Sequence, residues 1–229
     1  MVRKTALITG ASRGLGKELA LVFAKNSWDL IINGRNKGLL SGVKSLVSAN
    51  GVRCDVVVGD LASDETIVEL GEAARRREID AFVNNAGVYT KGQFLEMEVP
   101  EIERMVRVNL LAPMLLTREV YPIFRERRSG LIVNINSVAG EVGSPLEAVY
   151  CATKHGLRGF ADSLKYEATS DGVRIINIFG GGMQTDMTRE RDTYGKLMKP
   201  SEVADIIYAI SVERPSVRVD RVTLGRTEY

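Results

Sequence analysis

The chain of 229 residues suits one sizeable domain or two small ones, and its 45% apolar residues suffice for a well-buried core. Its 31 lysines and arginines nearly balance its 29 aspartates and glutamates, which leaves a net charge of +2. Such a balance gives no indication of binding to nucleic acid or to an anionic membrane. No apolar run reaches the length of a membrane span.

Cysteine and histidine are too few for a metal cluster. Cys54 and Cys151 do not form a Cys-x-x-Cys pair, and His155 is the only histidine. We therefore expect no metal site, reduced thiols and a cytoplasmic protein. The amino terminus shows no signal-like apolar region after a basic start, which favours the same compartment.

Short apolar runs rich in β-branched residues alternate along the chain with longer segments of helical periodicity. Strands are predicted at residues 6–9, 30–33, 54–58, 81–84, 131–136, 173–179 and 217–224, and helices at 14–26, 37–49, 63–77, 100–127, 149–170 and 200–212. This alternation is typical of βαβ units and of a parallel sheet buried on both faces. We expect an α/β fold: one domain over residues 1–229, with a doubly wound parallel sheet of about seven strands and helices on both faces.

The first predicted strand runs into a glycine-rich turn, Thr9-Gly10-Ala11-Ser12-Arg13-Gly14-Leu15-Gly16. Glycines permit a tight turn and let backbone N–H groups approach a pyrophosphate at the start of a helix. The turn therefore indicates nucleotide binding. The alternative is a tight strand-to-helix connection that binds nothing.

A phenol and an ammonium group stand four residues apart at Tyr150 and Lys154, thirteen residues after Ser137. On a helix this spacing places both side chains on one side. We expect the lysine charge to favour phenolate and to lower the pKa of Tyr150 from its ordinary value of about 10. Tyr150 could then exchange a proton with a substrate oxygen that Ser137 hydrogen-bonds. The alternative is a surface pair without chemistry.

Three motifs follow one another in the chain: Gly-x3-Gly-x-Gly from Gly10, Asn84-Asn85-Ala86-Gly87, and Tyr150-x3-Lys154. As an ordered set they resemble the short-chain dehydrogenase/reductase family over nearly the whole chain. The resemblance implies a Rossmann-like fold and an enzyme that transfers a hydride between nicotinamide and a ketone or secondary alcohol. It also implies four catalytic residues, Asn109, Ser137, Tyr150 and Lys154, with Lys154 holding the nicotinamide ribose.

The same resemblance implies a set of cofactor-binding residues. They are Gly10, Ser12, Arg13, Gly14, Leu15, Gly16, Arg35, Asp60, Leu61, Asn85, Ala86, Gly87, Tyr150, Lys154 and Thr185. In this reading Asp60 accepts a hydrogen bond from the adenine amine, residues 85–87 lie against the adenosine ribose, and Thr185 contacts the nicotinamide carboxamide. Alternatively, Asp60 or Ser63 caps the following helix, and residues 85–87 form only a strand-end turn.

The end of the second predicted strand indicates the preferred cofactor. Gly34 stands where NAD-preferring members of the resembled family tend to carry an acid for the ribose 2′-hydroxyl. Arg13 and Arg35 fall where NADP-preferring members carry basic residues, and a guanidinium fork suits a 2′-phosphate. We therefore expect NADP(H) as the cofactor. The alternative is that both arginines are solvated surface groups.

Pro113 gives a physical reason for a role of Asn109. Proline cannot donate the N–H that normally bonds the carbonyl four residues earlier, which here belongs to Asn109. We hypothesise that this carbonyl holds a water that links Lys154 to solvent as a proton relay. The alternative is that Pro113 only kinks the helix and Asn109 is a polar residue of the core.

The chain departs from the resembled family after the sixth predicted strand. Gly180 replaces the usual proline and begins a run of three glycines, so we expect this loop to be mobile without cofactor. Residues 183–199 follow, with apolar and charged side chains mixed, and are predicted to form a short substrate lid.

Two classes of function fit this sequence. The leading one is an NADP(H)-dependent oxidoreductase, either a 3-oxoacyl-carrier-protein reductase or a sugar, polyol or hydroxy-acid dehydrogenase. The other is a catalytically silent NADP(H)-binding sensor or scaffold of the same fold.

The helix predicted at 100–127 carries the apolar residues Met105, Leu111, Leu115, Leu116 and Ile123. With the resemblance, this stripe favours a homodimer or homotetramer, the alternative being ordinary core.

Overall fold

The computed structural model describes residues 3–212 and 216–227, and within them one sheet of seven parallel strands forms the centre of the fold. The sheet order is β3-β2-β1-β4-β5-β6-β7. The strands are β1 (Thr5–Ile8), β2 (Asp29–Gly34), β3 (Cys54–Val58), β4 (Ala81–Asn84), β5 (Gly130–Ser137), β6 (Val173–Gly180) and β7 (Arg221–Leu224). The predicted doubly wound α/β sheet is confirmed.

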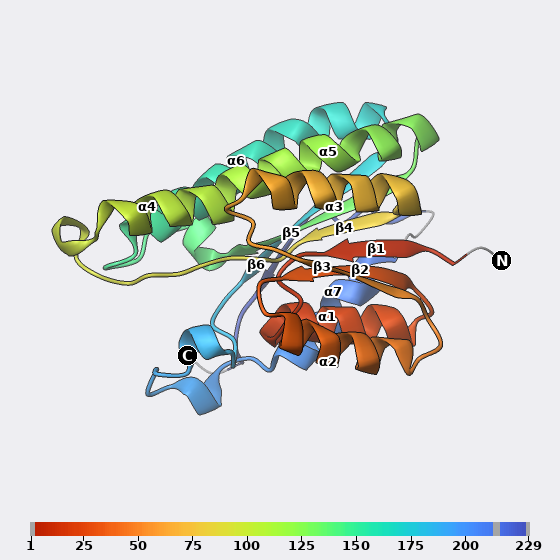
Figure 1. Cartoon of the computed structure of the whole chain (residues 1–229). Helices are drawn as coiled ribbons and strands as arrows, with labels where there is room; N and C mark the ends of the chain where they lie inside the picture. The colour runs from red at the N-terminus through yellow and green to blue at the C-terminus, as the bar shows by residue number, and fades with distance from the viewer. Residues whose placement is uncertain (1–2, 213–215, 228–229) are drawn as a thin grey trace.

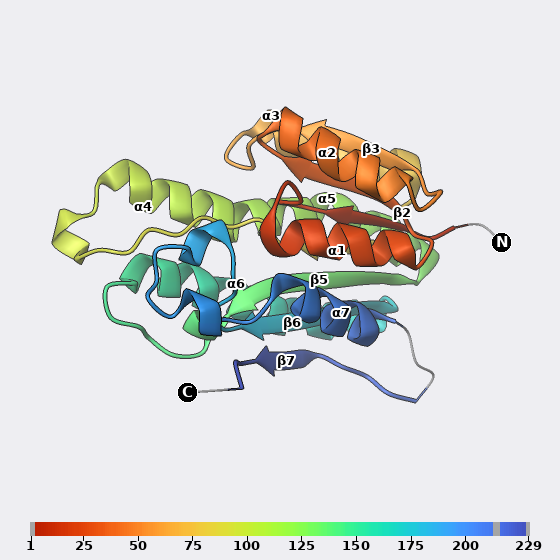
Figure 2. The same cartoon turned by 90° about the horizontal axis from the view of Figure 1, so that it is seen from below.

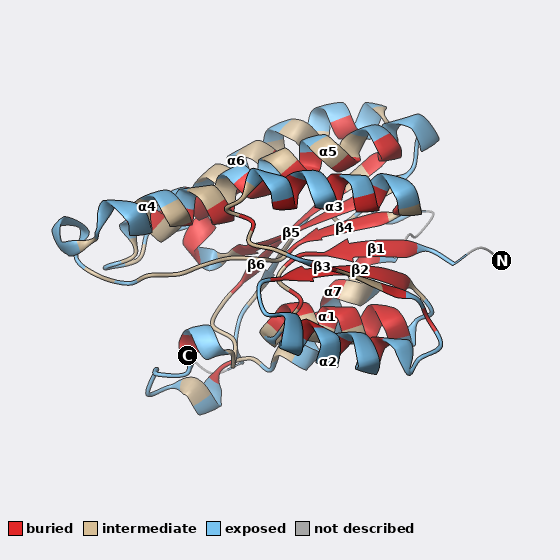
Figure 3. Cartoon of the chain, viewed as in Figure 1, coloured by how far each residue is buried: buried red, intermediate tan, exposed pale blue. Residues whose placement is uncertain are grey.

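Helices cover both faces of this sheet. One face carries α1 (Gly14–Lys25), α2 (Lys37–Ser48) and α7 (Pro200–Ser211), and the other carries α3 (Asp64–Arg77), α5 (Ala112–Arg127) and α6 (Ala148–Ser170) (Figure 1, Figure 2). Successive strand residues point to opposite faces, so Ala6 and Ile8 join the core on the α1 side while Leu7 joins the core on the α5 side. Buried residues accordingly fill the sheet and the inner sides of the helices (Figure 3).

Two elements differ from their predicted bounds. The helix predicted at 100–127 is divided into α4 (Val99–Val106), a π-helical turn (Arg107–Leu111) and α5, which begins just before Pro113. The division has a physical cause, because Pro113 lacks an N–H and its ring crowds the preceding turn, which a local widening of the helix relieves. The strand predicted at 217–224 is shorter, since β7 begins at Arg221. Nowhere in residues 3–212 and 216–227 does a helix combine the length and apolar character that a bilayer requires.

A row of buried asparagine side chains crosses the sheet beneath α6. Asn84 on β4 donates to Asn134 on β5 at 3.0 Å, and Asn134 donates to Asn177 on β6 at 3.3 Å. Asn177 in turn donates to Asp162 on α6 at 3.4 Å. The three asparagine side chains are buried and each amide satisfies its neighbour, so the row links three strands and ties them to α6.

The substitution Asn134→Ala is expected to lower the free energy of unfolding by about 2–4 kcal/mol, because it strands a donor on Asn84 and an acceptor on Asn177. Asn50→Ala is the matched control. The Asn50 amide donates to the carbonyl of Leu46 on the exposed side of α2, so its loss should lower the free energy of unfolding by less than about 1 kcal/mol. Urea unfolding followed by circular dichroism measures both. Equal losses would show that the buried row adds no stability.

Candidate functional site

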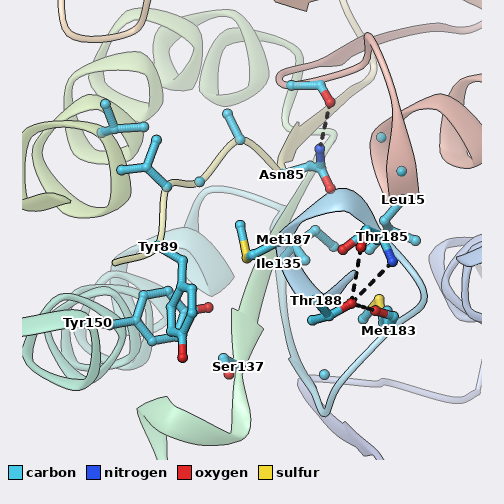
Figure 4. A pocket seen from close by; sticks show the side chains of 18 of the residues that line it. Leu15, Asn85, Tyr89, Ile135, Ser137, Tyr150, Met183, Thr185, Met187 and Thr188 are labelled. Carbon is cyan, nitrogen blue, oxygen red and sulfur yellow. Dashed lines mark hydrogen bonds between the residues drawn. The ribbon is translucent and has the colours of Figure 1, made fainter. Parts of the chain in front are cut away.

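A pocket of about 1100 Å³ opens at the carboxyl ends of the strands, where the strand order reverses between β1 and β4. In open α/β sheets this reversal point is where ligands bind. Figure 4 shows part of the lining, with Tyr89 and Tyr150 on one side and Leu15 and Thr185 on the other. Every predicted site residue except Asn109 lines the pocket: Gly10, Ser12, Arg13, Gly14, Leu15, Gly16, Arg35, Asp60, Leu61, Asn85, Ala86, Gly87, Ser137, Tyr150, Lys154 and Thr185.

The glycine-rich turn lies directly against the end of β4. Gly10 has φ +65°, in the left-handed region that favours glycine. A Cβ added to Gly16 would lie 2.3 Å from the carbonyl oxygen of Gly10 and 2.5 Å from the amide of Asn85. The Asn85 amide donates to the carbonyls of Thr9 at 2.8 Å and Gly10 at 3.2 Å, so this side chain holds the turn in place. The open backbone of the turn therefore faces the pocket, as a cradle for phosphate requires.

Three charged side chains meet at the β2 and β3 end of the pocket. Asp60 accepts from Arg104 at 2.8 Å, and Arg35 lies 3.8 Å from the same carboxylate oxygen. Burial alone would raise the pKa of Asp60, but hydrogen bonds from Ala62 and Arg104 and the nearby arginine charges together lower it, so the carboxylate stays charged. Of the two predicted caps, Ser63 is the one that caps α3. Arg104 was missed, because nothing in the sequence placed α4 beside the segment that follows β3.

Lys154 is a buried residue of the pocket lining. Its Nζ donates to the carbonyl of Ile135 at 3.0 Å and lies 5.8 Å from the ring centroid of Tyr150. Asn136 donates to the Lys154 carbonyl at 3.1 Å, which joins β5 to α6. Ser137 follows at the end of β5, and its hydroxyl accepts from the backbone of Ala139 at 3.2 Å. The predicted Ser137, Tyr150 and Lys154 are thus assembled around one end of the pocket.

The predicted lowering of the Tyr150 pKa is wrong for this structure. Burial raises the pKa of Tyr150 to about 12, and the Ser137 hydroxyl lowers it only in part. Burial also lowers the pKa of Lys154 to about 8, so the ammonium charge is itself weakened near neutral pH. The expectation considered the charge of Lys154 and left out the loss of water around both groups. Tyr150 is therefore a phenol at neutral pH.

Asn109 lies in the π-helical turn and outside the pocket lining. Its amide is fully used: the oxygen accepts from the backbone of Val88 at 2.8 Å, and the nitrogen donates to the Val88 carbonyl at 2.8 Å and to Thr153 at 3.3 Å. The side chain thus holds the segment after β4 against α6, next to Lys154. Any contact of Asn109 with the reaction would have to come from its backbone carbonyl.

Residues 183–199 contribute several side chains to the pocket lining, and their role as a lid stays a prediction. Met183 pairs with Met198 in a parallel bridge, and Gln184 donates to the carbonyls of Gly195 at 3.2 Å and Leu197 at 3.0 Å. Arg13 in the glycine-rich turn reaches Asp186 of this segment at 2.9 Å. The predicted mobility of the glycines at 180–182 without cofactor stays a prediction.

Three further side chains near Tyr150 were not predicted from the sequence. Tyr89, after β4, donates from its hydroxyl to Glu147 at 2.6 Å, and Arg191 of the 183–199 segment lies 3.9 Å from the same carboxylate. All three line the pocket. Glu147 precedes Tyr150 by three residues, so helical spacing was a signal that could have found it. Tyr89 and Arg191 lie in loops, where no periodicity marks them.

The family model described as short chain dehydrogenase matches residues 4–194. The chain belongs to the short-chain dehydrogenase family. It is 33% identical to the ketoacyl reductase HetN of Nostoc sp., over 95% of this chain and 79% of that protein. It is also 30% identical to a 3-oxoacyl-[acyl-carrier-protein] reductase of Synechocystis sp., over 93% of this chain and 91% of that protein. The solved short-chain dehydrogenase from Sphingobium yanoikuyae in complex with NADPH is 26% identical, with a TM-score of 0.88, over 96% of this chain and 87% of that one.

As a short-chain dehydrogenase, the chain is an oxidoreductase that acts on alcohol or keto groups with a nicotinamide cofactor. The residues present fit such a cofactor. The glycine-rich turn leaves no room for a Cβ at Gly16 and so brings open backbone to the place of a pyrophosphate. The same pocket is lined both by this turn and by Tyr150.

The substitution Gly16→Ala is expected to weaken NADPH binding at least about 30-fold, because its Cβ would displace the Gly10 backbone that faces the pyrophosphate. Gly42→Ala is the matched control: no atom lies within 4 Å of its added Cβ, so binding should not change. Fluorescence titration with NADPH measures affinity, and thermal unfolding verifies that both variants are folded. Unchanged affinity in a folded Gly16→Ala protein would contradict the cradle.

Proposed function

We propose that this short-chain dehydrogenase reduces a ketone with NADPH and that Tyr150 donates the proton. One observation carries the proposal. A half-buried phenol, whose pKa is raised to about 12 by loss of water around it, lines the same pocket as the Ser137 hydroxyl and the glycine-rich turn. A group that is protonated at neutral pH and lies beside a hydrogen-bond donor is suited to act as a general acid.

The proposed reaction divides the work between cofactor and protein. Reduced nicotinamide supplies a hydride when bound. The hydroxyl of Ser137 holds the substrate carbonyl oxygen and stabilises the negative charge that develops on it. Tyr150 gives its proton to that oxygen, which completes the alcohol and leaves a phenolate. The same residues run the oxidation in reverse, with the phenolate as base.

Lys154 and Asn109 are proposed to restore the proton on Tyr150. A lysine whose pKa burial lowers to about 8 exchanges its proton readily near neutral pH. Pro113 cannot donate a hydrogen bond to the carbonyl of Asn109, which supports a role of that carbonyl in holding a water. Such a water would join Lys154 to solvent. Lys154 would also hold the nicotinamide ribose.

NADP(H) is the cofactor that the charges at the adenosine end favour. Arg35 follows Gly34 directly and lines the pocket, and Gly34 presents no carboxylate that would repel a 2′-phosphate. Arg13 also lines the pocket, but its guanidinium is paired with Asp186. Asp60 is already paired with Arg104, which leaves the Arg35 guanidinium, 58% exposed, available for an anion.

Substrate class stays open between a 3-oxoacyl thioester and a sugar, polyol or hydroxy acid. The names of the two relatives above favour the thioester. Apolar side chains near Tyr150 support a partly apolar substrate, namely Val138, Val142, Met183 and Met187. The proposed lid at 183–199 contributes the last two.

A homodimer or homotetramer in the cytoplasm completes the proposal. Part of the predicted apolar stripe is ordinary core, because Met105, Leu116 and Ile123 are buried within the chain. Leu111 and Met114 remain exposed on one side of the divided helix and support a contact between subunits. The free cysteines Cys54 and Cys151 are compatible with a reducing compartment.

The substitution Tyr150→Phe is expected to lower the rate of NADPH-dependent ketone reduction by about 10²–10⁴-fold while NADPH affinity is kept, because it removes only the proton donor. Tyr166→Phe on the exposed side of α6 is the matched control and should leave the rate unchanged. NADPH oxidation is followed against a panel of ketones that includes an acetoacetyl thioester. If wild type binds NADPH tightly and turns over none of them, the sensor or scaffold class replaces this proposal.

The substitution Arg35→Ser is expected to weaken NADPH binding by about 10–100-fold and NADH binding by less than about threefold, because a charge-assisted contact to the 2′-phosphate is lost. Arg76→Ser, on the exposed side of α3, makes the same charge change away from the pocket. Fluorescence titrations with both cofactors measure the ratio. Equal weakening for the two cofactors would assign Arg35 to general binding rather than to the 2′-phosphate.

A further inference from the structure

Tyr89 touches the proposed proton donor through its ring. The two aromatic rings of Tyr89 and Tyr150 meet edge to face, with centroids 5.0 Å apart and planes at 86° (Figure 4). An edge-to-face contact of this kind favours one orientation of each ring. Tyr150 therefore cannot turn freely while Tyr89 stays in place.

Glu147 fixes Tyr89 from the other end. Its carboxylate accepts from the Tyr89 hydroxyl at 2.6 Å and is only 12% exposed, so the bond is short and shielded. Burial, followed by this bond, raises the pKa of Tyr89 to about 12, so Tyr89 remains a donor at neutral pH. Tyr89 is thus held at its hydroxyl and presents its ring to Tyr150.

The backbone before Glu147 is held in an unfavourable conformation. Leu146 has φ +63°, which a side chain with a Cβ seldom adopts. Its carbonyl accepts from the backbone of Gly92 at 3.0 Å, a bond that joins the segment after β4 to the start of α6. The chain therefore tolerates strain at the point that places Glu147 beside Tyr89.

Arg191, from the 183–199 segment, contacts both Tyr89 and Glu147. Its guanidinium lies 3.5 Å from the Tyr89 hydroxyl, 3.9 Å from Glu147 and 6.0 Å from the Tyr89 ring centroid. One segment thus contacts both the ring that orients Tyr150 and the carboxylate that holds this ring.

We propose that Tyr89 is a positioning residue for Tyr150, held by Glu147 and closed over by Arg191. The proposal rests on the proposed function, in which Tyr150 gives a proton to the substrate oxygen. Tyr89 acts by fixing the direction in which the Tyr150 hydroxyl points. A misplaced donor reduces the rate without any loss of cofactor binding.

The charges around Tyr150 predict shifts in the pH dependence of the reaction, which a purely structural role of this group of residues would not produce. Glu147 raises the pKa of Tyr150 and Arg191 lowers it. The titratable and charged groups facing Tyr150 come from its own helix, from the segment after β4 and from residues 183–199; they are Glu147, Cys151, Lys154, Tyr89 and Arg191. Alcohol oxidation needs the phenolate, whose fraction grows as pH rises through the Tyr150 pKa. Glu147→Gln should therefore move the rise in oxidation rate to lower pH, and Arg191→Met should move it to higher pH.

Two substitutions at Tyr89 separate its ring from its hydroxyl. Tyr89→Leu removes both and should lower kcat at least about tenfold, with the NADPH affinity kept within about twofold. Tyr89→Phe keeps the ring and should recover most of that rate. Tyr121→Leu is the matched control. Tyr121 also donates from its hydroxyl to a carboxylate, that of Asp171 at 2.8 Å, but it lies outside the pocket lining, so its substitution should affect only stability.

Crystal structures of wild type, Tyr89→Phe and Tyr89→Leu give a readout that needs no substrate. We expect the Tyr150 ring to keep its orientation in Tyr89→Phe and to move or occupy several orientations in Tyr89→Leu. An unchanged Tyr150 in Tyr89→Leu overturns the proposal. So does a rise in KM for the ketone with kcat unchanged, which would make Tyr89 a substrate contact. If wild type turns over no ketone while Tyr150 moves in Tyr89→Leu, the proposed function fails and the positioning role stands.

Discussion

The fold of the site depends on how closely the glycine-rich turn approaches the end of β4. Gly16 has no space for a Cβ because the Gly10 carbonyl and the Asn85 amide occupy it. This contact lies where the strand order reverses, so connections on either side leave in opposite directions and the pocket opens between them. The same strand end continues into the segment that Asn109 holds against α6. This contact thus joins the glycine-rich turn to the strand end from which the segment beside α6 begins.

Loss of water around Tyr150 and Lys154 determines their chemistry. Burial raises the pKa of the phenol and lowers that of the ammonium, so Tyr150 keeps its proton near neutral pH while Lys154 loses its proton more readily. Hydrogen bonds then fix the geometry: the Ile135 carbonyl holds the ammonium, and Asn136 ties the helix to β5. Burial and positioning therefore come from the same packing of α6 on the sheet.

Elements with strong periodicity were predictable from the sequence, and so were residues joined to them by fixed spacing. All strands except β7, and the helix that carries Tyr150, lie within a few residues of their predicted bounds. Apolar runs and helical repeats predict them well because these patterns follow burial directly. Ser137, Tyr150 and Lys154 meet because a strand end and one turn of helix bring them together.

Contacts between segments that lie far apart in the sequence were not predictable in this way. Arg104, Tyr89 and Arg191 reach the pocket from three separate segments, and only the tertiary fold places them there. The π-helical turn before Pro113 lay within a continuous helical pattern, whose periodicity does not register one widened turn. The Tyr150 pKa was missed for a related reason, since the sequence shows which charges are near but not how much water surrounds them.

The solvent isotope effect on the reduction rate tests the central claim most directly. With Tyr150 as the proton donor, single-turnover reduction of a ketone by NADPH should be slower in D₂O than in H₂O for wild type. In Tyr150→Phe the slow residual reaction should show a different isotope effect, because water or another group must then supply the proton. Equal isotope effects in the two proteins would contradict the account, because the proton would then come from another group.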